Sequence, residues 1–334
     1  MPSPARARLV DVAALAEVAP STASRALAGS SAIAPATVER VQAAAAELGY
    51  LTNLAAAGLK RGRTLNIGLL AIMSYWYAGA VTSGADRVAA QHGYDFVVVN
   101  SGDGTNPDLL LERARRLGQR VDGALIVDLE EGPLLDKTLE ALGVPAVTVG
   151  CQAPNNAAVL VDNLAIGGAA ARHMSDLGHE RAVVLTVENP SPFAFDNQVV
   201  RAEGFAETFP GTSHVARVPS GNHDLRRRSI REACSGVTAV FCISDELAIE
   251  ASAVLTDAGW RVPAEISVMG VDDHPLAGPL GLTTIEQQPN KIGQAAAELL
   301  LEQLSRSDTR VEPEEVTMPT RLLPRRSTAR VYGH

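Results

Sequence analysis

The chain has 334 residues, of which 46% are hydrophobic and 20% charged, and its formal net charge is −9 at pH 7. This composition is ordinary for a soluble globular protein, and no apolar run approaches the length of a membrane span. A chain of this length is longer than one hydrophobic core normally supports, so we expect a small unit together with a core of two subdomains.

The cysteines and the N-terminus indicate the cell compartment. Cys151, Cys234 and Cys242 are odd in number and form no CxxC pair, which argues against both disulfides and a zinc site. The N-terminal residues have no signal-peptide pattern. We therefore expect a cytoplasmic protein without metal or cofactor.

The first fifty residues predict three short helices with a tight turn between the first two. Small apolar side chains at Val10, Val12, Ala13 and Ala16 form one stripe of a first helix, and Val18 closes the turn. A third helix opens near Pro35 and ends at Gly49. Its expected buried positions are Val38, Val41, Ala45 and Leu48.

The second helix is predicted from Pro20 to about Leu27, with Gly29 ending it. Its expected inward positions are Ala23, Ala26 and Leu27. The outer face then carries Pro20, Ser21, Thr22, Ser24 and Arg25. This is the layout of a helix-turn-helix that reads DNA bases, although a three-helix surface subdomain without a ligand has the same pattern.

The charge distribution favours DNA binding. Residues 1–63 have a net charge of +3, while the rest of the chain has −12. A basic end on an acidic protein is expected when one segment alone meets phosphate.

From Leu65 onward, short apolar runs alternate with segments of helical period. The expected strands are Ile67–Ile72, Phe96–Val99, Gly123–Val127, Ala146–Val149, Val159–Val161, Ala182–Leu185, Ala239–Ile243 and Ile266–Gly270. Helical spacing occurs in segments such as Val81–His92, Pro107–Gly118, Leu164–Leu177 and Ala248–Gly259. Strands without alternation, joined by helices, predict parallel doubly wound sheets.

The N-terminal segment resembles the DNA-binding headpiece of the lactose-repressor (LacI/GalR) family. The matching residues are Asp11, Val12, Ala13, Val18, Thr22, Ser24, Arg25, Thr37, Arg40, Val41, Leu48, Gly49, Tyr50, Asn53, Ala56 and Leu59. The chain departs from the family at Ala19, where a helix-capping Ser is usual, and the lost cap costs about 1 kcal/mol. We expect a headpiece of marginal stability.

The resemblance implies that residues 51–63 form a hinge helix on DNA. Leu59 then inserts into the minor groove, and Lys60, Arg61 and Arg63 reach phosphates beside it. Alternatively, Leu59 packs against the following domain. The expected DNA contacts outside the second helix are Tyr50, Asn53, Ala56, Leu59 and Lys60.

The resemblance extends through the core, on motifs that include Asp162-Asn163, Gly167-Gly168, Arg201, Ser244-Asp245, Val271-Asp-Asp273 and Leu282-Thr-Thr-Ile285. It implies two α/β lobes like those of periplasmic sugar-binding proteins, with a ligand between them. The expected domains are a headpiece at 1–50, a hinge at 51–63 and a core at 64–334. Lobe 1 would hold about 64–161 and 289–320, and lobe 2 about 162–288 and 321–334.

Residues after the carboxyl ends of the strands are the candidates for effector binding. Tyr75-Trp76-Tyr77 places three of the few aromatic residues in one expected loop, where they could stack on a sugar or plug the lobe interface. Arg201 and Asp245 match effector-contacting positions, but could form a salt bridge across the cleft. The remaining candidates are Asp128, Phe195 and Asp273, and either Asp272 or Asp273 could instead cap a turn. Glu250, where the family usually has Gly, adds bulk and charge near the lobe interface.

Catalytic motifs are missing from the sequence: it has no HExxH motif, no GxSxG elbow and no third glycine after Gly102-Asp-Gly104. Arg226-Arg-Arg228 is interpreted as a solvated helix face. We therefore predict a homodimeric, non-enzymatic repressor that binds a pseudo-palindromic operator in double-stranded DNA and responds to a sugar-like effector. The alternatives are control by a nucleoside or a protein partner, or a binding module with an unused pocket.

Overall fold

The computed structural model describes residues 7–50, 63–71, 76–101, 106–129, 132–153, 155–188, 197–306 and 314–331. The chain divides into two compact units, Met1–Leu65 and Asn66–His334, and we describe each by itself.

The first unit is a bundle of three helices, α1 (Leu9–Leu15), α2 (Pro20–Leu27) and α3 (Pro35–Glu47). Pro occupies the first position of both α2 and α3, where its missing N–H costs nothing. The buried core is made of Val12, Ala13, Ala16, Ala23, Ala26, Val41, Ala44 and Ala45. The helix-turn-helix expected from the sequence is confirmed, with α2 at the predicted bounds.

Two side chains expected in this core lie outside it. Val10 is 51% exposed, because it precedes Val12 by two residues and therefore lies on the opposite side of α1. Leu48 is 37% exposed. It follows the last residue of the 13-residue α3, which is longer than the helices of 7 and 8 residues that cover it.

The second unit contains two six-stranded sheets. The sheet of lobe 1 has the order β11-β5-β4-β3-β1-β2, with strands β1 (Asn66–Ala71), β2 (Asp95–Asn100), β3 (Gly123–Val127), β4 (Ala146–Val149), β5 (Ala157–Val161) and β11 (Glu315–Met318). That of lobe 2 has the order β12-β10-β9-β8-β6-β7, with β6 (Arg181–Val187), β7 (Thr212–Val218), β8 (Ala239–Cys242), β9 (Ser267–Asp272), β10 (Thr283–Glu286) and β12 (Arg321–Leu323). All the strand pairs are parallel except β10 with β12.

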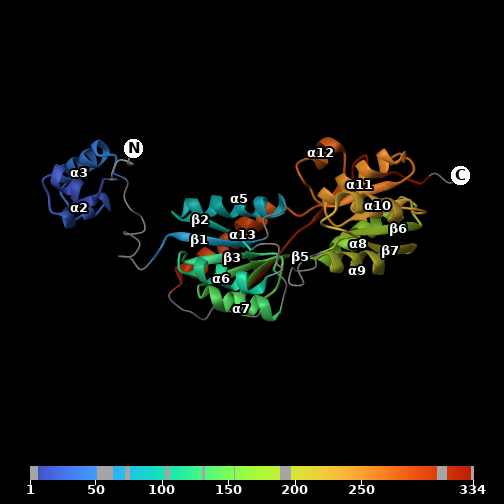
Figure 1. Ribbon diagram of the computed structural model, residues 1–334, viewed down its shortest axis with the longest axis horizontal. Coiled ribbons are helices and arrows are strands. Elements are labelled where there is room, and N and C mark those ends of the chain that lie inside the picture. The colour runs from blue at the N-terminus through green and yellow to red at the C-terminus, as the bar shows by residue number, and fades with distance from the viewer. Residues whose placement is uncertain are drawn as a thin grey trace. The chain divides into compact units, whose positions relative to one another are not determined.

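Helices cover both faces of each sheet (Figure 1). In lobe 1, α5 (Trp76–Gln91) and α13 (Pro289–Ser305) lie on one face, and α6 (Pro107–Gly118) and α7 (Pro133–Leu142) on the other. In lobe 2, α8 (Asn163–Asp176) and α9 (Asn197–Thr208) lie opposite α10 (His223–Ala233) and α11 (Asp245–Asp257). A short α12 (Ala277–Leu280) precedes β10. The predicted doubly wound lobes are thereby confirmed.

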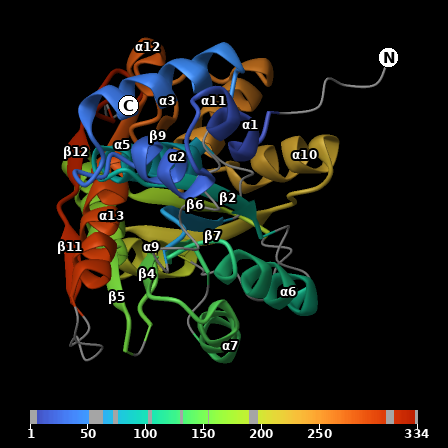
Figure 2. The same ribbon diagram turned by 90° about the vertical axis from the view of Figure 1, so that its left-hand side faces the viewer.

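The chain passes between the lobes three times. It leaves lobe 1 after β5, returns from β10 to α13, and leaves again between β11 and β12. Figure 2 shows the late strand β11 beside the mid-chain strand β5 at the edge of the first sheet. Each lobe is therefore assembled from segments far apart in the sequence.

The strands that the hydrophobic runs did not indicate are β7, β10, β11 and β12. Strands β7, β11 and β12 lie at sheet edges, where few side chains are buried and apolar runs are not required. The buried part of β10 is largely Thr283 and Thr284, which are polar residues that suit strands. Apolar patterning thus indicated eight strands, including the edge strand β2, and missed the other three edge strands and β10.

Glycines allow two helices of lobe 2 to pack closely. A Cβ on Gly167 of α8 would lie 2.0 Å from the backbone oxygen of Arg201 in α9, and one on Gly204 would lie 2.2 Å from the Leu164 oxygen. These distances leave no room for a side chain. The two glycines therefore set the position of the helix that carries Arg201.

Candidate functional site

The outer face of α2 presents the residues expected to contact DNA. Pro20, Ser21 and Arg25 are exposed, and Thr22 and Ser24 are partly exposed, while Ala23 and Ala26 face the core. The Nε of Arg25 donates a hydrogen bond to the backbone oxygen of Ser21 at 3.2 Å, so the guanidinium lies along the helix surface. This face is polar and carries one positive charge.

The start of α2 has no capping side chain. Ala19 occupies the N-cap with extended backbone, and no side chain accepts a hydrogen bond from the free N–H groups there. Tyr50 lies partly buried against the core of the first unit. The other predicted contacts, Asn53, Ala56, Leu59 and Lys60, lie outside the described residues, as do Tyr75 and Phe195.

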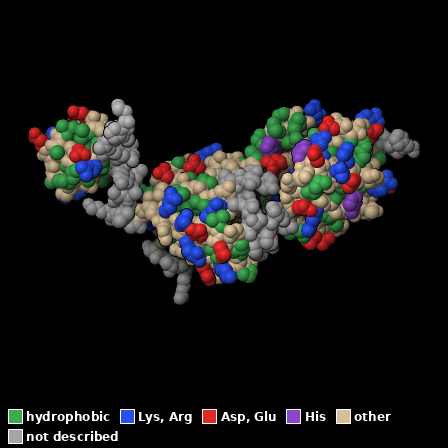
Figure 3. All heavy atoms as spheres, viewed as in Figure 1, with side chains coloured by type: hydrophobic (Ala, Val, Ile, Leu, Met, Phe, Trp, Pro, Cys, Tyr) green, Lys and Arg blue, Asp and Glu red, His purple; other side chains and the backbone are tan. Residues whose placement is uncertain are grey.

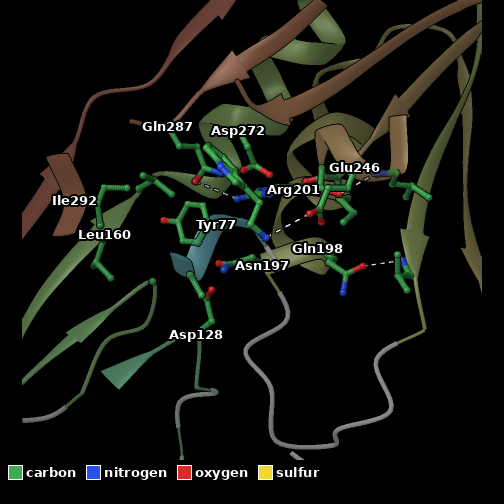
Figure 4. Close-up of a pocket in the computed structure, with 18 of the residues that line it drawn as sticks. Tyr77, Asp128, Leu160, Asn197, Gln198, Arg201, Glu246, Asp272, Gln287 and Ile292 are labelled. Atoms are coloured by element: carbon green, nitrogen blue, oxygen red, sulfur yellow. Dashed lines mark hydrogen bonds between the residues drawn. The ribbon is translucent and has the colours of Figure 1, made fainter. Parts of the chain in front are cut away.

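A cavity of about 210 Å³ lies in the second unit and is lined by residues of both lobes (Figure 4). An apolar cavity of ~150 Å³ can hold benzene, so this one has room for a ring-sized molecule. Its polar and aromatic lining is Trp76, Tyr77, Asp128, Glu188, Asn197, Gln198, Arg201, Arg226, Ser244, Glu246, Asp272 and Gln287. In Figure 4, Leu160 and Ile292 lie on one side of Tyr77, and Glu246 and Gln198 on the other.

Arg201 lies at the centre of this lining and is buried. Its Nε donates to Asn163 Oδ1 at 2.9 Å, and Nη1 donates to the backbone oxygen of Ile243 at 2.7 Å. Nη2 donates to Gln287 Oε1 at 3.2 Å. These neutral acceptors fix the orientation of the guanidinium while leaving part of its five-donor capacity for a ligand.

Three acidic groups surround Arg201. Burial raises the pKa of Asp128 to about 6, and the nearby charge of Arg201 opposes that rise. Burial likewise raises the pKa of Asp272 well above its ordinary value, and Gln287 donates a hydrogen bond to its carboxylate. The pKa of Tyr77 is raised by burial and by the charges of Asp128 and Asp272. Tyr77, Asp128, Arg201 and Asp272 therefore form one electrostatically coupled group with members from both lobes.

Two predicted effector residues, Asp245 and Asp273, do not line the cavity, and in each case a neighbouring residue in the sequence lines it instead. Asp245 is fully buried in the first turn of α11 and accepts a hydrogen bond from the His274 backbone N–H at 2.8 Å. Its neighbour Glu246 lines the cavity instead. The carboxylate of Asp273 is 2.7 Å from the guanidinium of Arg325, and the preceding Asp272 faces the cavity.

Local backbone geometry explains these two corrections. Ser244 caps α11, so the residues after it point around the helix axis by about 100° each. Ser244, Glu246 and Leu247 line the cavity, whereas Asp245 points away from it. At the end of β9, Asp272 and Asp273 have φ angles of 117° and 56°, which breaks the alternation of the strand. Hydrophobic periodicity predicts neither the start of α11 nor the backbone turn at the end of β9.

Trp76 and Tyr77 form the first turn of α5, and not a loop as expected. The backbone N–H of Trp76 donates to Glu246 Oε1 at 3.3 Å, and its ring meets the ring of His274 edge-on with centroids 5.0 Å apart. Trp76 belongs to lobe 1, whereas Glu246 and His274 belong to lobe 2. These two contacts connect the lobes across the cleft.

Glu250 pairs with Arg226, with Nε and Oε2 2.7 Å apart and both side chains largely buried. Arg226 also lines the cavity, so the first arginine of the expected solvated run is turned inward. Sequence reasoning missed this arginine and the amides Asn197, Gln198 and Gln287. Asn197 and Gln198 were detectable in principle, because they precede Arg201 by about one helical turn.

Within the described part of the chain, no group of three His, Cys, Asp or Glu residues is arranged to hold a metal ion. No helix among the described residues is long and apolar enough to cross a membrane.

Comparison with known families gives two matches. Residues 8–53 match the family described as bacterial regulatory proteins, lacI family, and residues 171–328 match a periplasmic binding protein-like domain. The HTH-type transcriptional regulator CelR of Thermobifida fusca is 30% identical to this chain, covering 96% of it and 98% of the relative.

Solved structures with the same fold include complexes with DNA and sugar. A lac repressor dimer bound to operator and the anti-inducer ONPF shares 25% identity with a TM-score of 0.83, covering 97% of this chain and 99% of that one. A CelR–cellobiose complex shares 27% identity with a TM-score of 0.66, covering 96% and 100%. On the identity to CelR over nearly the whole of both chains, and on the match of residues 8–53, this protein belongs to the lacI family of bacterial regulatory proteins.

Proposed function

We propose that this protein is a transcriptional repressor that binds an operator through its headpiece and a small sugar-like effector in the cavity between its core lobes. The observation that carries this proposal is the pairing of a helix-turn-helix with a polar cavity whose lining comes from both lobes. The repressor and sugar-bound structures among its relatives support both halves. We assign it a regulatory role and no catalysed reaction.

DNA recognition is assigned to α2. Its exposed face holds Ser21 and Arg25, with Thr22 and Ser24 beside them, and such a helix fits the major groove. The basic charge of residues 1–63 supplies the sequence-independent attraction to phosphate. We further propose that Asn53, Ala56, Leu59 and Lys60 contact DNA from the hinge, with Leu59 in the minor groove.

Effector binding is assigned to Arg201, Asp128, Tyr77 and Trp76, joined by Glu246 and Asp272. Hydroxyl groups of a sugar can bond to the carboxylates and the guanidinium, while the apolar faces of the ring pack on aromatic and aliphatic side chains. Because the groups come from two lobes, a bound ligand changes the balance between open and closed lobes. That difference is what can alter operator affinity.

A homodimer is proposed as the functional form. Apolar atoms gather over α12 in the space-filling view (Figure 3), where Leu276 and Leu280 are 51% and 50% exposed. An exposed apolar patch of this kind suits a partner subunit. Two headpieces related by two-fold symmetry would read a pseudo-palindromic operator.

The decisive experiment is selection of genomic DNA bound by the full-length protein, followed by titration of the selected site. We expect a specific complex whose affinity falls steeply with salt, by ~10³ or more between 50 and 200 mM if six or more phosphates are contacted. Arg25→Ala should weaken it at least tenfold, a loss of ~1.4 kcal/mol, whereas Arg115→Ala should not change it. Arg115 is the matched control because it is an exposed arginine of the core unit, on α6.

The ligand half of the proposal has its own test. A sugar panel should include members that raise the melting temperature saturably and change operator affinity. Arg201→Lys should weaken that shift, because the single nitrogen of an ammonium group cannot reach the three acceptors that the three guanidinium nitrogens reach. Operator binding that no small molecule alters would contradict the effector assignment.

A further inference from the structure

The cavity wall carries more negative than positive groups. Its lining includes the carboxylates of Asp128, Glu188, Glu246 and Asp272, and only two cationic side chains, Arg201 and Arg226. A neutral sugar can bond to these carboxylates through its hydroxyls, but it does not need a net negative wall, because hydroxyl and amide side chains also accept and donate hydrogen bonds.

The two cations do not cancel this charge. Arg226 is already paired with Glu250, a carboxylate outside the lining. Arg201 is bonded to neutral oxygens of Asn163, Ile243 and Gln287, and so offers one positive charge to Asp128 and Asp272 together. Even without Asp272, whose pKa is raised by burial, the carboxylates of Asp128, Glu188 and Glu246 outnumber Arg201, the one lining cation not paired with Glu250, so the wall is acidic.

The segments that flank the lining elements in sequence supply no compensating cation. Residues 72–75, 130–131 and 189–196, which lie outside the described residues, contain no Lys or Arg in the sequence. By sequence alone, these segments cannot reverse the sign of the charge.

Asp128 is the carboxylate best placed to receive a ligand. Among the residues that the structure describes, no hydrogen bond or ion pair reaches its carboxylate. Its neighbour Gly150 has no side chain, and a Cβ there would lie 2.5 Å from Asp128 Oδ1. The missing side chain leaves this oxygen open to the cavity that both residues line.

An apolar wall lies near this carboxylate. Leu160 and Ile292 lie on one side of the Tyr77 ring, with Asp128 below it (Figure 4). A sugar ring could place its C–H face on these side chains and its polar substituents towards Asp128 and Asp272.

Resting on the proposed effector function, we propose that the cavity selects a polyhydroxylated ligand bearing a protonated amine, with the ammonium group at Asp128, and that it rejects carboxylated and phosphorylated sugars. A hydroxyl and an ammonium group can both donate a charge-assisted hydrogen bond to a carboxylate, but only the ammonium group adds the attraction between two full charges. An anionic ligand would instead meet like charges in a site of low dielectric constant.

The test is calorimetric titration of the full-length protein with matched sets of ligands. One set is glucose, glucosamine and glucuronate, a second is sorbitol, glucamine and gluconate, and a third is cellobiose with its diamino counterpart. In at least one set, the amine should bind about tenfold or more tightly than the neutral member. In the first two sets, the acid should bind most weakly.

Asp128→Asn should reduce the ratio of amine to neutral affinity to about threefold or less, because it removes the charge while keeping the shape. Asp128 has a φ of 52°, which Asn adopts readily, so the variant should fold, and its melting temperature without ligand checks this. Asp136→Asn is the matched control, since Asp136 is exposed on α7 and outside the lining. It should leave the ratio unchanged.

Several results would overturn the inference: neutral members that bind as tightly as the amines, acids that bind best, no binding by any amine, or an unchanged ratio in Asp128→Asn. Operator binding is measured separately without ligand. Its loss would contradict the proposed function, whereas release of operator by a neutral sugar alone would contradict only the amine selection.

Discussion

At the scale of single residues, Asp245 is the clearest case of an ionisable side chain that is buried away from water. It is fully buried beneath the sheet of lobe 2, and a Cβ on Gly270 would lie 2.2 Å from its Oδ1. Burial raises the pKa of Asp245 to about 7, although the His274 N–H opposes that rise. In the folded protein the acid is therefore protonated at pH values well below 7, where a free aspartate is already ionised.

This arrangement predicts how stability depends on pH. The pKa of Asp245 is raised in the folded state. The contribution of this side chain to the free energy of unfolding is therefore complete below the ordinary pKa of 3.8, and it is lost as pH rises to about 7. The free energy of unfolding of Asp245→Asn relative to the parent should therefore rise between pH 5 and pH 8, by a few kcal/mol at most, and the melting temperatures of the two proteins should follow it. A relative stability independent of pH would contradict the raised pKa, and Asp86→Asn, at an exposed site on α5, is the control.

The uncapped start of α2 gives a second residue-scale prediction. Ala19→Ser places a hydroxyl where Ala19 has none, next to free N–H groups, and should stabilise the headpiece by about 1 kcal/mol. Amide exchange in residues 20–27 of the full-length protein should slow by a few-fold, while exchange in the core strands stays the same. Faster exchange in α2 would show that the Ser hydroxyl does not cap the helix.

At the scale of elements, the close approach of α8 and α9 determines where Arg201 lies. Gly167→Ala would force its methyl group against the Arg201 backbone oxygen, so α9 must shift. Overpacking of this kind costs about 1–3 kcal/mol, and we expect effector affinity to fall with it. The measurements are the melting temperature and ligand titration of the same variant.

Substitutions at two other glycines serve as controls for Gly167→Ala. Gly118→Ala creates an equal clash, 1.8 Å from the Leu142 oxygen, but outside the cavity lining, so it should lower stability without lowering the ligand affinity of the folded protein. Gly79 of α5 has nothing within 4 Å, and Gly79→Ala should stabilise by up to about 1 kcal/mol. Equal losses of ligand affinity in Gly167→Ala and Gly118→Ala would contradict the positioning role.

The elements also show how much the sequence could predict. Apolar runs indicated the central strands, and proline and glycine positions indicated the bounds of α2 and α6. Three of the four edge strands, β7, β11 and β12, were not predicted because side chains at a sheet edge are not required to be apolar. In the cavity, Arg201 and Asp128 were predicted to lie together, whereas Asp245 and Asp273 were each one residue away from the lining position. That difference depends on a helix cap and on two positive φ angles, which periodicity does not encode.

At the scale of the whole core unit, the lobes are held together at the cleft by Trp76. Trp76→Ala removes the ring contact with His274, worth about 1 kcal/mol, while the backbone bond to Glu246 can remain. We expect the closed arrangement to lose up to about tenfold in population, and the ligand to change operator affinity by a different factor. Operator titrations with and without ligand measure that factor, and an unchanged factor would contradict the role of Trp76 in coupling.

The three passages of the chain between the lobes have a consequence for synthesis on the ribosome. The headpiece is built from residues 9–47 alone and can fold once they emerge. Lobe 1, however, lacks a helix and a strand until α13 and β11 are made, and lobe 2 lacks its edge strand β12 until residues 321–323. A ribosome that stalls before Pro289 therefore releases a fragment whose headpiece can fold but whose two core lobes are incomplete. Quality control of such fragments matters more for this topology than for a protein whose sensing domains are continuous in sequence.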